Sequence, residues 1–154
     1  QRTRSFCKSL VRVLNSCYIN RGKMSIREVL IKSSELGYDK IALISEIKGN
    51  PSRIDFQDAL GEIILSLDIT VGIPNSNADS KSRVKSENLK LNSEVSELDQ
   101  LGNILDIPKF TEGTPLENLM VIKGSDHKYR ALVEFYGSNG IETGPKIFIK
   151  EWRY

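Results

Sequence analysis

The sequence predicts an α/β protein with a mixed sheet, built from two similar halves. Each half begins with a helical pattern of apolar residues and continues with about three short segments typical of β-strands. A polar stretch at 74–87, almost without apolar side chains, separates residues 1–73 from residues 88–154. We therefore expect one domain, residues 1–154, in which two related αβ units are joined by an exposed linker. No residue-level repeat links the two units.

Residues 2–17 predict a helix with one basic and one apolar face. At about 100° per residue, Arg4, Lys8 and Arg12 fall within roughly 80° of one another. The apolar residues lie on the opposite side: Phe6, Leu10, Val13, Leu14 and Cys17. Cys7 and Cys17 are too few for a disulfide scaffold, and we expect both to be buried, reduced thiols.

Residues 25–36 predict a second helix, which follows a short basic connection at 18–23. Ser25 and Glu28 have the spacing of a capping box, in which the hydroxyl caps the helix start and the carboxylate reaches back. Gly37 is a natural end for this helix.

The remaining elements are predicted from alternation, β-branched residues and turn residues. Pro51 is expected to keep the turn at 48–52 out of the ladder. A third helix is predicted at 94–105, and a glycine-rich turn at 137–144. Strands are predicted at 41–47, 53–56, 63–71, 89–91, 119–123, 129–136 and 147–152.

The net charge of +2 hides an asymmetry between the ends of the chain. Residues 1–53 hold 11 of the 22 Lys and Arg but four acids, 11 − 4 = +7, which leaves 11 − 16 = −5 for the rest. A basic end on a nearly neutral protein indicates a surface that faces a polyanion, although basic termini also serve solubility alone.

The sequence lacks the usual signs of catalysis. His127 beside Asp126 is a chance neighbour pair, and there is no P-loop, nucleophile elbow or Cys/His cluster. We expect neither an enzyme nor a cofactor or metal. No stretch approaches the roughly 20 apolar residues that cross a bilayer, so a cytoplasmic protein without a membrane partner is expected. The chain begins at Gln1 rather than Met, which predicts that upstream residues were trimmed or left out.

Three segments in this order resemble the archaeal branch of the Brix domain. They are the run 1–6 (Gln-Arg-Thr-Arg-Ser-Phe), the run 18–25 (Tyr-Ile-Asn-Arg-Gly-Lys-Met-Ser) and Gly49-Asn50-Pro51 after a strand. The closing strand at 146–153 and the overall length also fit. Members of that family usually have a short first strand and a basic turn just before the first run. This sequence starts within the run, so that strand is absent or its place in the sheet is filled otherwise.

The resemblance implies a two-half fold, in which each half is similar to the anticodon-binding domain of class II aminoacyl-tRNA synthetases. It also implies an archaeal ribosome-biogenesis protein that contributes to pre-rRNA processing and subunit assembly through contacts rather than chemistry. The implied partners are ribosomal RNA or its precursor, together with ribosomal or other assembly proteins.

RNA binding requires positive charge for the phosphates and groups that stack on bases. The start of the second helix, near Ser25, is a further candidate phosphate site. The candidate RNA contacts are Arg2, Arg4, Lys8, Arg12, Arg21, Lys23, Arg27, Lys48, Asn50 and Arg53. Stacking candidates are few: Tyr18, Tyr38, Trp152 and Tyr154. We expect core positions for Phe56, Phe135 and Phe148, and we also favour the core for Trp152.

Two other functions remain open. One is a scaffold in a ribonucleoprotein particle whose main contact is a partner protein, which an exposed apolar groove would favour. A continuous basic face across the first two helices, without an apolar patch, would favour RNA. A tRNA-binding module follows from the fold resemblance alone.

Overall fold

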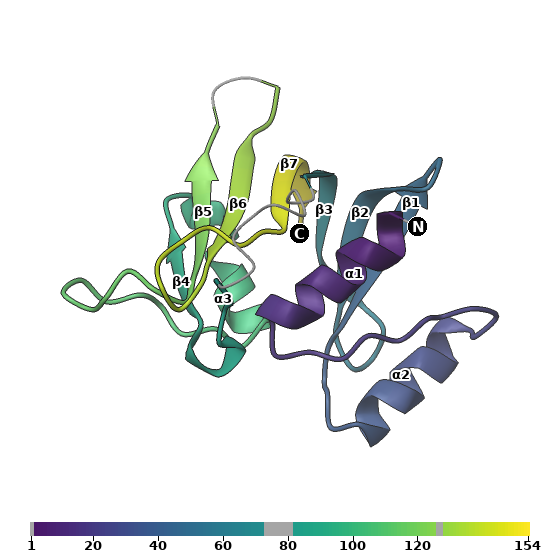
Figure 1. The fold of residues 1–154 in the computed structure, drawn as a ribbon. Coiled ribbons are helices and arrows are strands. Elements are labelled where there is room, and N and C mark those ends of the chain that lie inside the picture. Colours follow the sequence, from purple (N-terminus) through teal and green to yellow (C-terminus); the bar gives the residue numbers. More distant parts are fainter. Residues whose placement is uncertain (1, 73–81, 126–127) are drawn as a thin grey trace.

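The computed structural model describes residues 2–72, 82–125 and 128–154, which form one seven-stranded sheet with helices beside it (Figure 1). The helices are α1 (Arg2–Val13), α2 (Ile26–Glu35) and α3 (Gln100–Ile104), with 3₁₀ turns at Ser86–Asn88 and Ser96–Leu98. The strands are β1 (Ile41–Ile47), β2 (Asn50–Gln57), β3 (Ile63–Gly72), β4 (Lys90–Ser93), β5 (Leu119–Gly124), β6 (Ala131–Tyr136) and β7 (Lys146–Arg153). The mixed α/β class is confirmed.

The strand order is β1-β2-β3-β7-β6-β5-β4, so two antiparallel meanders meet in the middle of the sheet. β3 and β7 form this central antiparallel pair, in a register from Ser66 opposite Arg153 to Gly72 opposite Lys146. At one edge, β4 lies parallel to β5. At the other edge, no strand of the described residues lies beside the outer side of β1.

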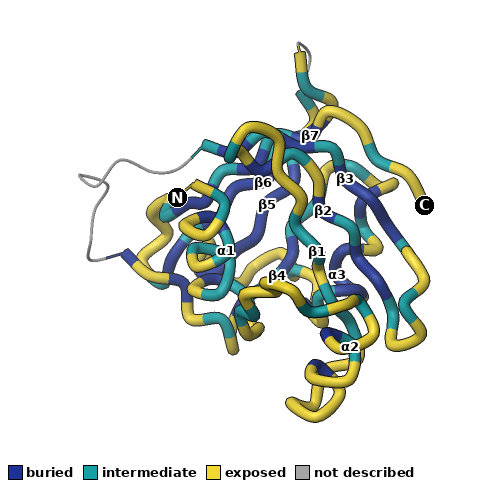
Figure 2. The backbone as a smooth tube through the Cα atoms, turned by 90° about the vertical axis from the view of Figure 1, so that its right-hand side faces the viewer, coloured by how far each residue is buried: buried dark blue, intermediate teal, exposed yellow. Residues whose placement is uncertain are grey.

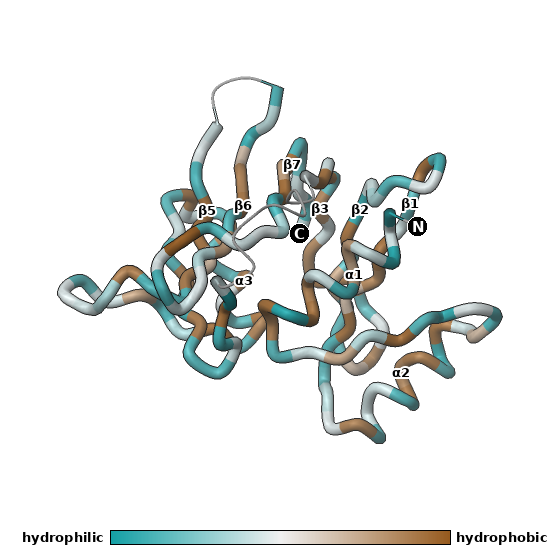
Figure 3. Tube along the Cα trace, in the orientation of Figure 1, coloured by the Kyte–Doolittle hydropathy of each residue, from teal (hydrophilic) through white to brown (hydrophobic). Residues whose placement is uncertain are grey.

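The core lies between one face of the sheet and the helices α1 and α3. Phe6 of α1, Leu65 of β3, Phe135 of β6 and Ile149 of β7 are completely buried in it. Buried segments are concentrated in the strands, whereas α2 and most connections are exposed (Figure 2). The hydropathy pattern agrees, with apolar residues recurring along the strands (Figure 3).

The first two helices follow local sequence rules only in part. α2 is confirmed, with Ser25 as its N-cap and Gly37 at a φ of 89° just beyond its end. α1 ends at Val13, so its predicted extension to residue 17 is wrong. Asn15 and Ser16 follow the helix, and such side chains compete for backbone groups and weaken helical continuation.

The predicted helix at 94–105 is wrong in its length. It is divided into the 3₁₀ turn at Ser96–Leu98 and the five-residue α3. Ser93 accepts a hydrogen bond from the N–H of Val95, which favours a local turn at the start. Within α3, a Cβ on Gly102 would lie 3.1 Å from the Ile107 carbonyl, so the chain folds back tightly there.

The turn between β1 and β2 is shorter than predicted. Only Lys48 and Gly49 form it, with φ values of 52° and 80°, as expected for a two-residue hairpin. Pro51 belongs to β2 and pairs with Glu46, so the expectation that it stays outside the ladder is wrong. The pairing of β1 with β2 shifts register between Ser45 and Glu46. This bulge accommodates Pro51, which has no N–H to donate to the neighbouring strand.

The predicted exposed linker at 74–87 is described only from residue 82, because residues 73–81 lie outside the described part of the chain. Its described end is not simply exposed: Ser82 and Val84 are buried. The Ser82 hydroxyl contacts Asn139 and donates to the carbonyl of Ile141 at 3.1 Å. Gly137 permits this approach, because a Cβ there would collide with residue 83.

Two expectations for single side chains are also wrong. Cys17 is exposed, and Cys7 is only half-buried, although burial still raises the pKa of its thiol. Phe148 lies half-buried outside the core and packs on Tyr129, with ring centroids 4.9 Å apart. Phe56 and Phe135 are buried as predicted, and Trp152 packs against the core.

Candidate nucleic-acid interface

The anchoring of α1 determines which of its side chains reach solvent. Phe6 and Val13 are buried against the sheet. The Thr3 hydroxyl donates to the Gly49 carbonyl at 3.2 Å, and Arg2 donates to the Val71 carbonyl at 2.6 Å. Because these contacts hold the apolar side of α1 against the sheet, its opposite side is exposed. Arg4, Lys8 and Arg12 lie on that exposed side, as their spacing predicts.

The chain between α1 and α2 presents three more exposed basic residues: Arg21, Lys23 and Arg27. Arg21 donates from Nε to the Met24 carbonyl at 2.9 Å, which folds this connection back on itself. Ser25 accepts a hydrogen bond from the Glu28 N–H at 3.2 Å, so the hydroxyl half of the predicted capping box is present. The Glu28 carboxylate lies 3.4 Å from the Ser25 hydroxyl and places negative charge at the helix start. This charge weakens the start of α2 as a phosphate site.

The β1–β2 turn lies beside the start of α1, because Thr3 is bonded to Gly49. Lys48 and Asn50 flank that glycine and are exposed. In Figure 1 the turn and the beginning of α1 are at the same end of the molecule. The structure thus brings these two candidates next to Arg2, although 46 residues separate the bonded pair in sequence.

Residues 2–27 contain seven basic side chains and no Asp or Glu. None of the seven forms an ion pair with an acid in the described residues. Their positive charge is therefore not neutralised by a direct ion pair with a described acid, so this surface attracts anions. We call it the basic surface: Arg2, Arg4, Lys8, Arg12, Arg21, Lys23, Arg27, Lys48 and Asn50.

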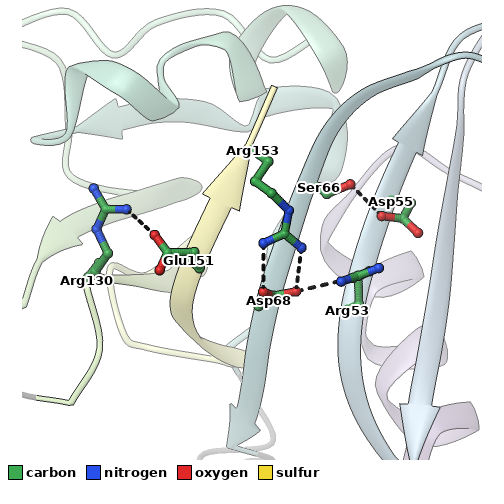
Figure 4. A network of polar contacts seen from close by, with 7 residues as sticks. All are labelled: Arg53, Asp55, Ser66, Asp68, Arg130, Glu151 and Arg153. Carbon is green, nitrogen blue, oxygen red and sulfur yellow. Dashed lines mark hydrogen bonds and ion pairs between the residues drawn. The ribbon is translucent and has the colours of Figure 1, made fainter.

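Arg53 is placed elsewhere. It immediately precedes the core residue Ile54 in β2, and side chains alternate along a strand, so Arg53 points to the face of the sheet opposite α1. There its Nε lies 3.2 Å from Asp68, which also accepts two hydrogen bonds from Arg153 at 3.1 and 3.2 Å (Figure 4). The hydrogen bond from Arg153 is the main cause that holds the pKa of Asp68 below its ordinary value. The structure does not bring Arg53 together with the basic surface.

Three further basic residues of the second half of the chain, Lys123, Arg130 and Lys146, are likewise paired with acids. Arg130 lies 2.6 Å from Glu151, and its guanidinium also stacks 4.0 Å from the centre of the Trp152 ring. The buried Glu134 contacts Lys123 at 2.8 Å and Lys146 at 3.5 Å. Burial raises the pKa of Glu134, but the two lysines outweigh this effect and leave that pKa lowered. The charges of these three residues are therefore compensated by acids.

The aromatic candidates for stacking are scattered. Tyr38 is 37% exposed and Tyr154 is 58% exposed, whereas Tyr18 is half-buried. Burial, followed by the charges of Glu97 and Asp99, raises the pKa of Tyr154, so acidic residues are close to it. An acidic neighbourhood is unfavourable for nucleic acid.

A feature that sequence reasoning did not identify is a cavity of about 680 Å³ beside β1. Its walls are α1, the chain at 14–21 and the strand β1, and core side chains of the sheet form its floor. Cys7, Leu10, Val11 and Leu14 line it from α1. We call it the β1 groove. The half-exposed Val11, between the basic residues Lys8 and Arg12, is the one local signal that could have indicated it.

Two classes of feature are not found in the described residues. Residues 2–72, 82–125 and 128–154 hold no group of three or more His, Cys, Asp or Glu that could hold a metal ion. No helix within these ranges is both long and apolar enough to span a bilayer. The Asp126–His127 pair lies outside the described residues.

Curated relatives of the chain are archaeal, while no protein-family model matches it. A protein named probable Brix domain-containing ribosomal biogenesis protein, from Methanothermobacter thermautotrophicus, is 51% identical over 61 residues. This match covers 40% of the chain and 37% of that relative. The protein of the same name from Pyrococcus horikoshii is 44% identical over 57 residues, 36% of the chain and 25% of the relative. The matched segments thus span well under half of these relatives.

Solved structures match over a larger share. The crystal structure of Mil, an archaeal Imp4-like protein, has a TM-score of 0.81 and 29% identity and covers 99% of the chain and 92% of its own. A probable ribosomal biogenesis protein from Aeropyrum pernix K1 has a TM-score of 0.69 and 21% identity over 96% of the chain and 88% of its own, which supports the fold alone. The resemblance read from the sequence is therefore confirmed: the chain is a homologue of the archaeal Brix-domain ribosomal biogenesis proteins.

Proposed function

We propose that this protein binds ribosomal RNA or its precursor through the basic surface and so contributes to pre-rRNA processing and subunit assembly, without catalysis. The observation that carries the proposal is the set of seven basic residues between 2 and 27 with no acid among them and no ion pair to the described acids. The names of the archaeal relatives support the ribosomal setting.

The physical basis of binding is the release of counterions from RNA phosphates when protein cations replace them. Arg4, Lys8 and Arg12 lie along one side of a helix, so they follow a phosphate backbone as a stripe of charge. Because exposed aromatic side chains are few near this stripe, we infer that RNA shape and backbone charge dominate recognition over base stacking.

The proposal extends to the organisation of the chain. We propose a single Brix-type domain over residues 1–154, with halves at 1–73 and 88–154 and a linker at 74–87. The likeness of each half to the anticodon-binding domain of class II aminoacyl-tRNA synthetases, implied by the family, is part of this proposal, and so is a cytoplasmic location.

The test is the affinity for ribosomal RNA fragments at a series of salt concentrations. Wild type is compared with Arg4→Glu/Lys8→Glu/Arg12→Glu and with a control of equal charge change, Lys85→Glu/Lys109→Glu/Lys128→Glu, in which all three side chains are also exposed. We expect steep weakening of wild-type binding with salt, with a log–log slope of about −0.7 for each phosphate neutralised on single strands.

The α1 variant should lose about two units of that slope and most of its affinity, while the control keeps both. Circular dichroism establishes that all three proteins are folded. Equal losses in the two variants would mean that net charge alone drives binding, and unchanged binding by the α1 variant would exclude the basic surface.

A second candidate function is a scaffold whose main contact is a partner protein. The β1 groove favours it, because an exposed apolar groove lies directly beside the basic helix. Binding of a partner through this groove should be insensitive to salt, in contrast to binding of RNA.

A further inference from the structure

The central strand of the sheet carries an aromatic side chain on the face opposite α1. Phe148 of β7 is half-buried, whereas its strand neighbours Ile147 and Ile149 are buried in the core. It pairs with Thr70 of β3 on one side and with Leu132 of β6 on the other. Because side chains alternate along a strand, Phe148 belongs to the same face as the Asp68 ion pairs of Figure 4.

The neighbours of the Phe148 ring hold it in place and leave part of it open. Tyr129 packs on it, with ring centroids 4.9 Å apart and an interplanar angle of 37°. Lys128 lies over Tyr129, 5.7 Å from its ring centre, so Tyr129 braces Phe148 and is itself covered by the lysine. On β3, a Cβ at Gly72 would lie 3.5 Å from Cε2 of Phe148, so the glycine leaves the ring uncovered on that side.

The surroundings of the ring fit a single base better than a protein partner. Two residues from Thr70 along β3, the same face carries Asp68 with its two arginines. Beyond Leu132 it carries Lys123, paired with Glu134. A protein interface needs a core of several adjoining apolar side chains. One half-exposed ring among charged groups instead presents the area of one base, and bases of unpaired RNA stack on aromatic rings.

The ring is also close to the basic surface. Arg2 donates to the Val71 carbonyl at 2.6 Å, and the residue before Val71 is Thr70, which pairs with Phe148. Since neighbouring strands are about 4.8 Å apart, Phe148 lies one strand and one residue away from the Arg2 contact. At the same end of the sheet, Arg2 and the exposed Lys150 line one hollow. An RNA strand bound along α1 can therefore pass over this end of the sheet to the ring.

We propose that the Phe148 ring stacks on one unpaired base of the RNA strand that the basic surface binds. This proposal rests on the proposed RNA-binding function and adds a base contact to it. Lys146, whose Nζ lies 6.0 Å from the ring centre, borders the stacking position. Because every base has a π face, the contact tolerates different sequences but requires a base that is free of its helix, so it favours unpaired over paired RNA.

Two probes separate stacking from backbone charge. One is a fluorescent single-stranded oligouridylate of about 12 nucleotides, a length within the usual range of single-strand sites. The other has the same length and the same phosphates, with abasic spacers in place of the bases. Anisotropy at a series of salt concentrations measures both affinities. We expect wild type to bind the oligouridylate about tenfold more tightly, with the same salt slope for both probes, because stacking adds affinity without neutralising a phosphate.

Three substitutions locate the contact. Phe148→Leu keeps an apolar side chain but removes the ring, so its affinity for the oligouridylate should fall about tenfold, to the level of the abasic probe, at an unchanged salt slope. Phe148→Tyr keeps a ring and should bind as wild type does. Phe110→Leu is the matched control, because Phe110 is also half-buried but lies beside the edge strand β4, where its N–H bonds to Leu91. Circular dichroism establishes that each variant is folded.

Photocrosslinking provides a second measurement that does not depend on a substitution. An oligouridylate that carries 5-bromouridine is irradiated in complex with wild type, and mass spectrometry identifies the modified residues. We expect crosslinks to Phe148 or Tyr129. Crosslinks confined to other parts of the chain would place the bases elsewhere and overturn the proposal.

The binding data can contradict the proposal in three ways. Wild type could bind both probes equally, Phe148→Leu and Phe110→Leu could lose the same affinity, or Phe148→Leu could lose affinity for both probes alike. The last result would mean that the ring supports only the fold. Failure of the basic surface has a different signature, namely an unchanged salt slope in Arg4→Glu/Lys8→Glu/Arg12→Glu on both probes. No measurable binding of either probe at low salt would overturn both proposals.

Discussion

At the residue scale, arginine side chains occupy two different environments in this protein. Arg4 and Arg12 are unpaired with the described acids, whereas Arg53 and Arg153 share Asp68. Helical spacing predicted the exposure of the first pair. It could not predict the ion pairs, because Asp68 and Arg153 are 85 residues apart and meet only through the β3–β7 register.

This contrast predicts different results for two arginine substitutions. Arg4→Ala should reduce the slope of RNA affinity against salt by about 0.7, as for one lost phosphate contact. Arg53→Ala should leave the slope unchanged and lower the melting temperature slightly, because it removes an exposed ion pair. Fluorescence titration with RNA and thermal unfolding measure both effects. An equal loss of slope in Arg53→Ala would restore that residue to the interface.

Asp68 predicts a pH dependence of stability. Its pKa is lowered in the folded protein, mainly by Arg153, so its charged form stabilises the fold above the unfolded pKa of about 3.9. That contribution is lost as the pH falls through the lower, folded-state pKa. Asp68→Asn should therefore be less stable than wild type in urea unfolding at pH 6, and the difference should shrink as the pH falls below about 4. A constant difference down to pH 2 would contradict this origin.

At the element scale, the ends of a helix were predicted correctly where residues at those ends determine them. The Ser25–Glu28 capping box and Gly37 located both ends of α2. The apolar spacing at 94–105 predicted a longer helix than exists, because Ser93 accepts a hydrogen bond from the Val95 N–H and the chain forms a 3₁₀ turn at Ser96–Leu98 before α3 begins. Pro51 belongs to a strand because β2 pairs with β1 through a bulge that leaves Ser52 without a partner residue, and such a bulge depends on the pairing of the two strands and not on the local sequence.

The cap of α2 can be tested on its own. Ser25→Ala should destabilise α2 by about 1 kcal/mol, because the Glu28 N–H loses its acceptor. Ser34→Ala, at an exposed position inside the same helix, is the control and should stabilise the helix slightly. Native-state hydrogen exchange of the α2 amides measures both. Equal exchange in wild type and Ser25→Ala would show that the cap contributes nothing.

At the scale of the whole molecule, two antiparallel meanders are joined at the β3–β7 pair in the centre of one sheet. The strand segments and the mixed α/β class could be predicted from sequence. The pairing of the last strand with β3 could not, because periodicity carries no information on strand order. The β1 groove was missed for the same reason, since it forms where α1, the chain at 14–21 and β1 meet.

This joining predicts that the two halves unfold together. Trp152 is the only tryptophan and lies on β7 in the second half, where it packs against the shared core. Ile54→Ala removes buried side-chain volume from the first half and should cost about 2–5 kcal/mol. If the core is shared, this substitution shifts the urea midpoint of Trp152 fluorescence as far as that of far-UV circular dichroism. Val133→Ala, in the second half, should likewise shift both midpoints together. If Ile54→Ala leaves the fluorescence midpoint unchanged, each half unfolds as its own unit. The β3–β7 pair would then be only a contact between two separate domains.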